Sequence, residues 1–122
     1  MKRLLLMLLF IPSLAFAAGP YDGIWQTSQG DFQSIHESED ATMIMMEFDP
    51  SDLNIIALIG SRSGSVADLS LALGSGYIRI NLVFDTLTTG RVLILECTNI
   101  FGNPCFNPTL LPIQASTMNK VF

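Results

Sequence analysis

A histidine and two methionines have the most specific chemistry in this sequence. His36 is the only histidine among 122 residues, and Met43 and Met45 follow it closely. If residues 31–49 form a hairpin with a loop of two or four residues, His36 lies across from Met43, and strand alternation places both methionines on the face of His36. Imidazole and thioether groups are soft ligands that suit Cu(I). The spacing therefore predicts a Cu(I) site of His36, Met43 and Met45.

The length of the hairpin loop decides this prediction. In the register that joins the three ligands, Ile35, Ile44 and Met46 face the core. A loop with an odd number of residues would instead separate His36 from Met43. The histidine and the Met-x-Met pair resemble parts of small periplasmic copper-binding barrels, and this resemblance implies a soft-metal carrier as one alternative function.

The two cysteines, Cys97 and Cys105, favour a structural disulfide. Seven residues separate them, whereas a redox pair usually has Cys-x-x-Cys spacing. Closing this short loop would contribute about 2–3 kcal/mol on the chain-entropy estimate.

The candidates for catalysis are weak, and we expect a protein that is not an enzyme and has no cofactor. The stretch Gly60–Gly64 is similar to a nucleophile elbow, but Arg62 stands where the serine belongs, so a hairpin turn is the better interpretation. Glu37, Glu39 and Asp40 lie next to His36 at a predicted hairpin tip. Solvent there would not raise a carboxyl pKa as a glycosidase requires.

Charge and composition exclude two further classes. The chain has 6 basic and 11 acidic residues, 49% hydrophobic and 14% charged residues, and a mean hydropathy of +0.45. So few charges argue against intrinsic disorder. The acidic balance argues against a nucleic-acid partner.

The first residues are typical of a cleaved signal peptide. Lys2 and Arg3 precede the apolar run Leu4–Ile11, and Ala15-Phe16-Ala17 is a small-x-small cleavage site. We therefore expect residues 1–17 to be removed and residues 18–122 to form one domain in the periplasm or outside the cell. The mature domain would keep four basic and eleven acidic residues, a net charge of −7. The apolar run is too short for a transmembrane helix, so no transmembrane segment is expected in the mature chain.

Short apolar runs between turn residues predict an all-β fold. The connections are too short for parallel crossovers, so we expect an antiparallel up-and-down meander of seven or eight short strands, forming a small barrel or sandwich. Proline and asparagine in residues 99–112 indicate a loop tied by the disulfide. The expected runs are Gly23–Ser28, Asp31–Glu37, Thr42–Asp49, Leu53–Gly60, Val66–Leu73, Tyr77–Asp85, Arg91–Thr98 and, more weakly, Ile113–Phe122.

Two of these runs are apolar on both faces, which indicates a surface that is covered or used for contacts. We predict an outer interaction surface that consists of Ile56, Leu58, Leu93 and Leu95.

The run Gly23-Ile24-Trp25 resembles the opening strand of lipocalin-like and avidin-like barrels. Trp25 is expected to plug one end of the core, with its N–H reaching a carbonyl at the rim. The leading functional hypothesis is an exported, non-enzymatic binding or interaction protein of the cell envelope. Its partner would be another protein or a second copy of the chain. An inhibitor of a secreted hydrolase is another alternative, besides the Cu(I) carrier.

Overall fold

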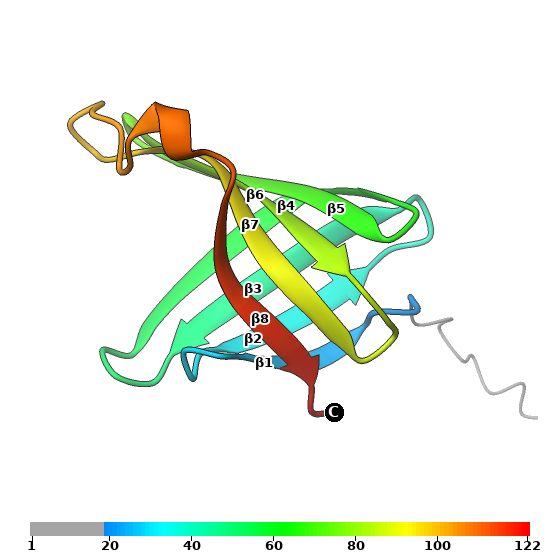
Figure 1. The fold of residues 1–122 in the computed structure, drawn as a ribbon. Helices are drawn as coiled ribbons and strands as arrows, with labels where there is room; N and C mark the ends of the chain where they lie inside the picture. Colours follow the sequence, from blue (N-terminus) through cyan, green and yellow to red (C-terminus); the bar gives the residue numbers. More distant parts are fainter. Residues whose placement is uncertain (1–18) are drawn as a thin grey trace, which may run out of the picture.

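Eight antiparallel strands make up the structure, a computed structural model that describes residues 19–122 (Figure 1). The predicted signal peptide, residues 1–17, lies outside these described residues. One turn of 3-10 helix, η1 (Pro108–Leu110), precedes the last strand. The strands are β1 (Gly23–Thr27), β2 (Phe32–Glu37), β3 (Thr42–Asp49), β4 (Asn54–Ser63), β5 (Val66–Leu73), β6 (Gly76–Phe84), β7 (Thr89–Thr98) and β8 (Ile113–Lys120).

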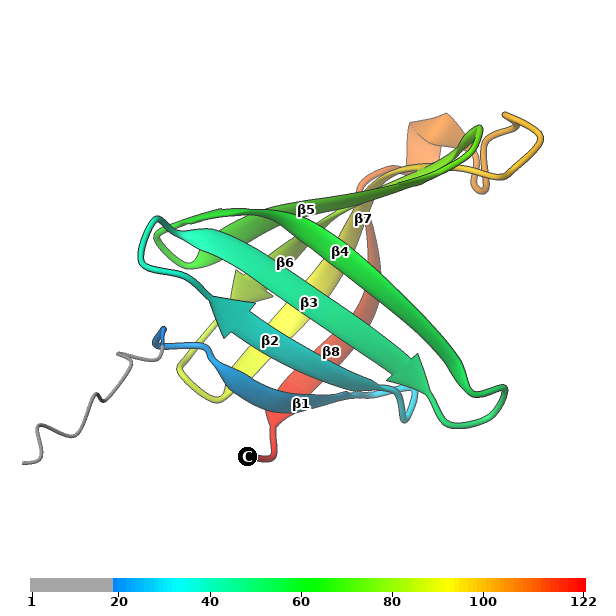
Figure 2. The ribbon, with the colours of Figure 1, turned by 180° about the vertical axis from the view of Figure 1, so that it is seen from behind.

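Each strand pairs with the next along the chain, and β1 pairs with β8 to close a barrel (Figures 1 and 2). The predicted all-β meander is confirmed, and the fold is a barrel rather than a sandwich. Closure pairs the two strands that would otherwise be edges, which removes a template for aggregation. Among residues 19–122, no helix is long and apolar enough to cross a membrane.

The two ends of the barrel carry different connections. We call one the plug end; it has the β2–β3, β4–β5 and β6–β7 turns and the last residue, Phe122. We call the other the mouth end; it has the β1–β2, β3–β4 and β5–β6 turns and the loop of residues 99–112. This division follows from the meander, because alternate connections must lie at opposite ends.

Strand β4 is longer than predicted, because it continues to Ser63 and only Gly64 and Ser65 separate it from β5. The interpretation of Gly60–Gly64 as a hairpin turn is therefore wrong. A Cβ atom at position 60 would overlap the backbone oxygen of Asp68 on β5. Glycine here allows a close approach of two strands rather than a reversal of the chain.

An apolar core fills the barrel from the plug end. The indole N–H of Trp25 donates to the carbonyl of Tyr21 at 2.9 Å, as predicted. The Tyr21 ring stacks on Phe84 with centroids 3.8 Å apart, and Phe84 also contacts Trp25. Inward residues of the other strands complete the core, including Ile35, Met43, Met45, Leu58, Ala67, Leu69, Ile80, Leu82, Val92 and Met118.

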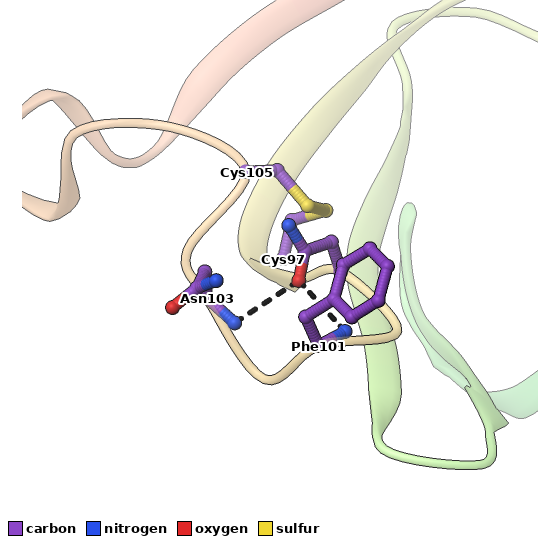
Figure 3. The surroundings of a disulfide bond; sticks show 5 residues. Cys97, Phe101, Asn103 and Cys105 are labelled. Carbon is purple, nitrogen blue, oxygen red and sulfur yellow. Dashed lines mark hydrogen bonds between the residues drawn. A yellow bond between two sulfur atoms is a disulfide. The ribbon is translucent and has the colours of Figure 1, made fainter.

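The disulfide between Cys97 and Cys105 is confirmed, with Cα atoms 5.3 Å apart (Figure 3). It joins the end of β7 to the loop of residues 99–112. Within that loop the Oδ1 atom of Asn99 accepts hydrogen bonds from the backbone N–H groups of Phe101 and Asn103 (Figure 3). The Ser75 hydroxyl also bonds the carbonyl of Ile100, which ties the loop to the β5–β6 turn. The loop thus has a defined path at the mouth end.

Candidate functional site

The predicted copper ligands lie on opposite faces of the barrel wall. Met43 and Met45 are 0% and 1% exposed in the core, whereas the His36 side chain is 69% exposed on the outside. His36 is in register with Ile44, and Glu37 is in register with Met43. The prediction that the three share a face is therefore wrong. His36 instead contacts Asp22, with 3.1 Å between Nδ1 and Oδ2.

The β2–β3 turn explains this error. Ser38 and Thr42 close the turn, because the N–H of Ser38 donates to the carbonyl of Thr42 at 2.9 Å. Three residues lie between them, and Ala41 has a left-handed φ of 63°. A three-residue turn that ends in a left-handed residue is a common hairpin connection. Its odd length moves every inward side chain of β3 by one position relative to the two- or four-residue loops.

Two of the four residues predicted as an outer interaction surface point into the barrel. Leu58 is 2% exposed, and Ile56 packs against the core. Their neighbours Ile55 and Ile59 are the exposed side chains of β4. This part of the prediction is wrong because both faces of β4 are apolar, so alternation does not say which one is inward.

The other two predicted surface residues, Leu93 and Leu95 on β7, are half-buried. Their neighbour Ile94 packs against the core, and Val92 belongs to it. Register shifts disturb the pairing of β7 with both neighbouring strands here.

A cavity of about 190 Å³ opens inside the mouth end of the barrel. Apolar side chains from several strands form most of its wall, and polar side chains of β1, β3 and β8 and the β1–β2 turn form the rest. Ile56 and Leu58 are among the apolar residues. The full lining consists of Thr27, Gln29, Asp31, Met45, Glu47, Ile56, Leu58, Ile78, Ile80, Val92, Ile94, Ala115 and Ser116.

Glu47 on β3 is the distinctive polar group of this cavity. It is half-buried and in register with Gln33 on β2 and Ile56 on β4. The Nε2 atom of Gln33 donates to its carboxylate at 2.7 Å. Burial raises the pKa of Glu47, the hydrogen bond from Gln33 opposes this, and the charges of Asp31 and Asp49 add to the increase. Gln33 itself is fully buried, and its Oε1 atom has no hydrogen-bond partner.

More carboxylates surround the cavity entrance. Asp31 lines the cavity, and burial together with the charges of Asp49 and Asp52 raises the pKa of Asp31. Among residues 19–122, no ion pair includes any of these aspartates or Glu47. The mouth end is therefore an acidic entrance to an apolar cavity.

A second hollow, more open and about 290 Å³, lies at the same end between the β5–β6 hairpin and the start of the disulfide loop. Ile78 belongs to both linings, which brings the two spaces close together. The wall of this second hollow is mainly apolar and includes Leu71, Tyr77 and Ile100.

The plug end holds a second inward glutamate in a different environment. Glu37 is buried, and the guanidinium of Arg62 on β4 donates to both of its carboxylate oxygens at 2.7 Å. Arg62 also lies over the Tyr21 ring, 5.4 Å from its centroid. The carboxyl of Asp22 accepts the backbone N–H of Glu37 at 2.8 Å. This glutamate is fully satisfied within the fold.

Sequence reasoning missed Gln33 and Glu47 as site residues. The signal was present on β2, where the polar Gln33 and Glu37 alternate with the side chain of His36 and share a face with Ile35. The predicted hairpin had a loop with an even number of residues. In that register the apolar side chains of Ile44 and Met46 point inward and Glu47 points outward.

Within the described residues 19–122, no three His, Cys, Asp or Glu side chains are grouped to hold a metal ion. The chain matches no protein-family model, and no curated protein or solved structure matches it significantly. The candidate site therefore rests on the geometry of the barrel.

Proposed function

We propose that this protein is an exported, non-enzymatic binding protein that takes a small molecule into the mouth-end cavity. The observation that carries the proposal is the cavity itself, which combines an apolar wall with a few polar groups at one side. Ligand sites commonly have this composition, and the interior of a small barrel is a frequent place for them. Export is supported by the signal-peptide pattern and by the disulfide, which suits an oxidising compartment.

The cavity volume limits the size of the bound group. An apolar protein cavity of about 150 Å³ holds one benzene molecule. A volume of about 190 Å³ therefore suits one six-membered ring with a short substituent. A larger ligand would extend from the mouth toward the neighbouring hollow beside Ile78.

Filling the cavity tests this proposal. Benzyl alcohol, a neutral probe of suitable size, should shift the methyl NMR signals of Ile56, Leu58 and Ile94 in a saturable way. Ile56→Phe should abolish these shifts because the larger ring occupies the space. Ile55→Phe is the matched control, since Ile55 is 68% exposed on the opposite face of the same strand. Unchanged binding to Ile56→Phe would contradict the proposal.

The outer face of β3 and β4 also presents exposed apolar side chains, namely Ile44, Met46, Ile55 and Ile59. A protein partner and a homo-oligomer stay predictions from the sequence. The geometry does not support a Cu(I) carrier through His36, Met43 and Met45, because these ligands lie on opposite faces of the barrel wall.

A further inference from the structure

We infer that the ligand of the mouth-end cavity is an organic cation, an ammonium group on a compact apolar body, with Glu47 as its counter-ion. This inference rests on the proposed function and specifies the ligand of the same site. It follows from the carboxylate at the cavity wall, from the position of the basic side chains of residues 19–122, and from the acidic groups at the entrance.

Glu47 forms no ion pair with a side chain of residues 19–122. Its carboxylate is half-buried, and Gln33, a neutral group, donates the hydrogen bond it receives. A carboxylate removed from water is costly unless a positive charge or several donors compensate it. The burial of Glu47 raises its pKa, as expected for a carboxylate that no cation stabilises.

The lysine and arginine side chains of residues 19–122 have other partners or lie near the other end of the barrel. Arg62 pairs with Glu37, Arg79 pairs with Asp68 and Glu96, and Arg91 pairs with Asp85. Lys120 is in register with Trp25 near the plug end. These are the four basic residues of the described part of the chain, so no basic side chain there is available to Glu47. A cation at the cavity must come from outside the described residues 19–122.

The acidic side chains at the cavity entrance favour positively charged ligands. Asp31 lines the cavity, and Asp49 and Asp52 lie near enough to raise the pKa of Asp31. This negative field attracts cations and repels carboxylates. Next to Glu47, the Oε1 atom of the buried Gln33 side chain also has no hydrogen-bond partner, so the surroundings of the Glu47 carboxylate contain more acceptors than donors.

An organic cation fits better than a metal ion. Within residues 19–122, no three acidic, histidine or cysteine side chains converge on a metal position. Hard cations such as Ca²⁺ take six to eight oxygen ligands. Apart from a few polar groups such as Asp31, the cavity wall is instead formed by apolar side chains such as Ile56, Ile94 and Val92. An ammonium on an apolar body would satisfy both the carboxylate and this wall.

Three probes of one shape test the inference: benzylamine, benzyl alcohol and benzoate. At pH 7 we expect benzylamine to bind at least about ten-fold more tightly than benzyl alcohol, because it adds a charge-assisted hydrogen bond in a desolvated site. Benzoate should bind most weakly. Glu47→Gln should weaken benzylamine about ten-fold and change benzyl alcohol by less than about two-fold.

Glu39→Gln is the matched control, because it removes one negative charge from an exposed position at the plug end. It should leave the affinities of all three probes unchanged. If benzyl alcohol and benzylamine bind equally, or if the preference survives in Glu47→Gln, the inference is wrong and the proposed function stands. If none of the probes shifts the cavity methyl signals, both are wrong. Saturable Ca²⁺ binding at Glu47 that displaces benzylamine would assign the site to a metal and overturn the inference.

Discussion

Glu37 at the plug end and Glu47 at the mouth end both point into the barrel from neighbouring strands, yet their partners differ. The guanidinium of Arg62 contacts both oxygens of Glu37, and Asp22 accepts its backbone N–H. Glu47 receives one hydrogen bond from neutral Gln33 and faces a cavity. The same residue type therefore completes the fold at one end and is left with unsatisfied charge at the other.

This difference shows how a closed barrel can keep stability and binding apart. The plug end combines three packed aromatic rings with an internal ion pair. The mouth end is less tightly packed, because it contains a cavity of about 190 Å³ with polar groups in its wall. Substitutions at the two ends should accordingly affect different properties.

The largest effect is expected at the plug end. Arg62→Met should lower the free energy of unfolding by about 3 kcal/mol, because it leaves the buried Glu37 carboxylate without its cation. Urea denaturation at pH 7 measures this change. The control Arg79→Met removes an arginine from exposed pairs with Asp68 and Glu96, which should cost much less because solvent screens these pairs. Equal losses in the two variants would mean that the Glu37–Arg62 pair has no special role.

The elements of the barrel could be predicted, because tight turns and alternating runs mark each strand. Which face of a strand is inward could not be predicted where both faces are apolar, as on β4 with Ile55, Ile56, Leu58 and Ile59. On β3 one residue of the preceding turn decides which side chains point inward, because the left-handed Ala41 gives the loop an odd number of residues. An alanine there gives no sequence signal, since glycine or asparagine is the usual residue at such positions.

The cavity was unpredictable for a related reason. It depends on which strands bring Ile56, Glu47 and Ile94 together around one space, and alternation on a single strand does not contain this information. By contrast, the disulfide and the position of Trp25 could be predicted. The chain has two cysteines, which allow one pairing, and one tryptophan.

A smaller effect, of opposite sign, is expected at the mouth end. Glu47→Gln should raise the free energy of unfolding at pH 7 by no more than about 1 kcal/mol, because a half-buried carboxylate without a cation is replaced by a neutral amide. The raised pKa of Glu47 means that the folded protein binds its proton more tightly than the unfolded chain does. The stabilisation that comes from the protonated form of Glu47 is therefore fully present below the unfolded-state pKa. It is lost as the pH rises through the folded-state pKa.

Denaturation of the wild type and Glu47→Gln between pH 4 and pH 7.5 measures this contribution. The wild type should lose stability relative to the variant as the pH rises. A difference that stays constant over this range, or a wild type that gains on the variant, would show that the pKa of Glu47 is not raised in the folded protein, and would contradict this prediction.

The smallest effect is expected in the pKa values of two aspartates, one from each end of the barrel. NMR titration of the side-chain carboxyl signals measures both values. Hydrogen bonds from Ser38 and Thr42 lower the pKa of Asp40, in the plug-end β2–β3 turn, to about 2. At the mouth end, burial and the charges of Asp49 and Asp52 raise the pKa of Asp31. Asp31 should therefore titrate at clearly higher pH than Asp40. Asp49→Asn should lower the pKa of Asp31 and leave that of Asp40 unchanged, because only Asp31 lies within the acidic entrance. If Asp31 does not respond, the carboxylates around the mouth do not act as one negative field, and the selection of cations would depend on Glu47 alone.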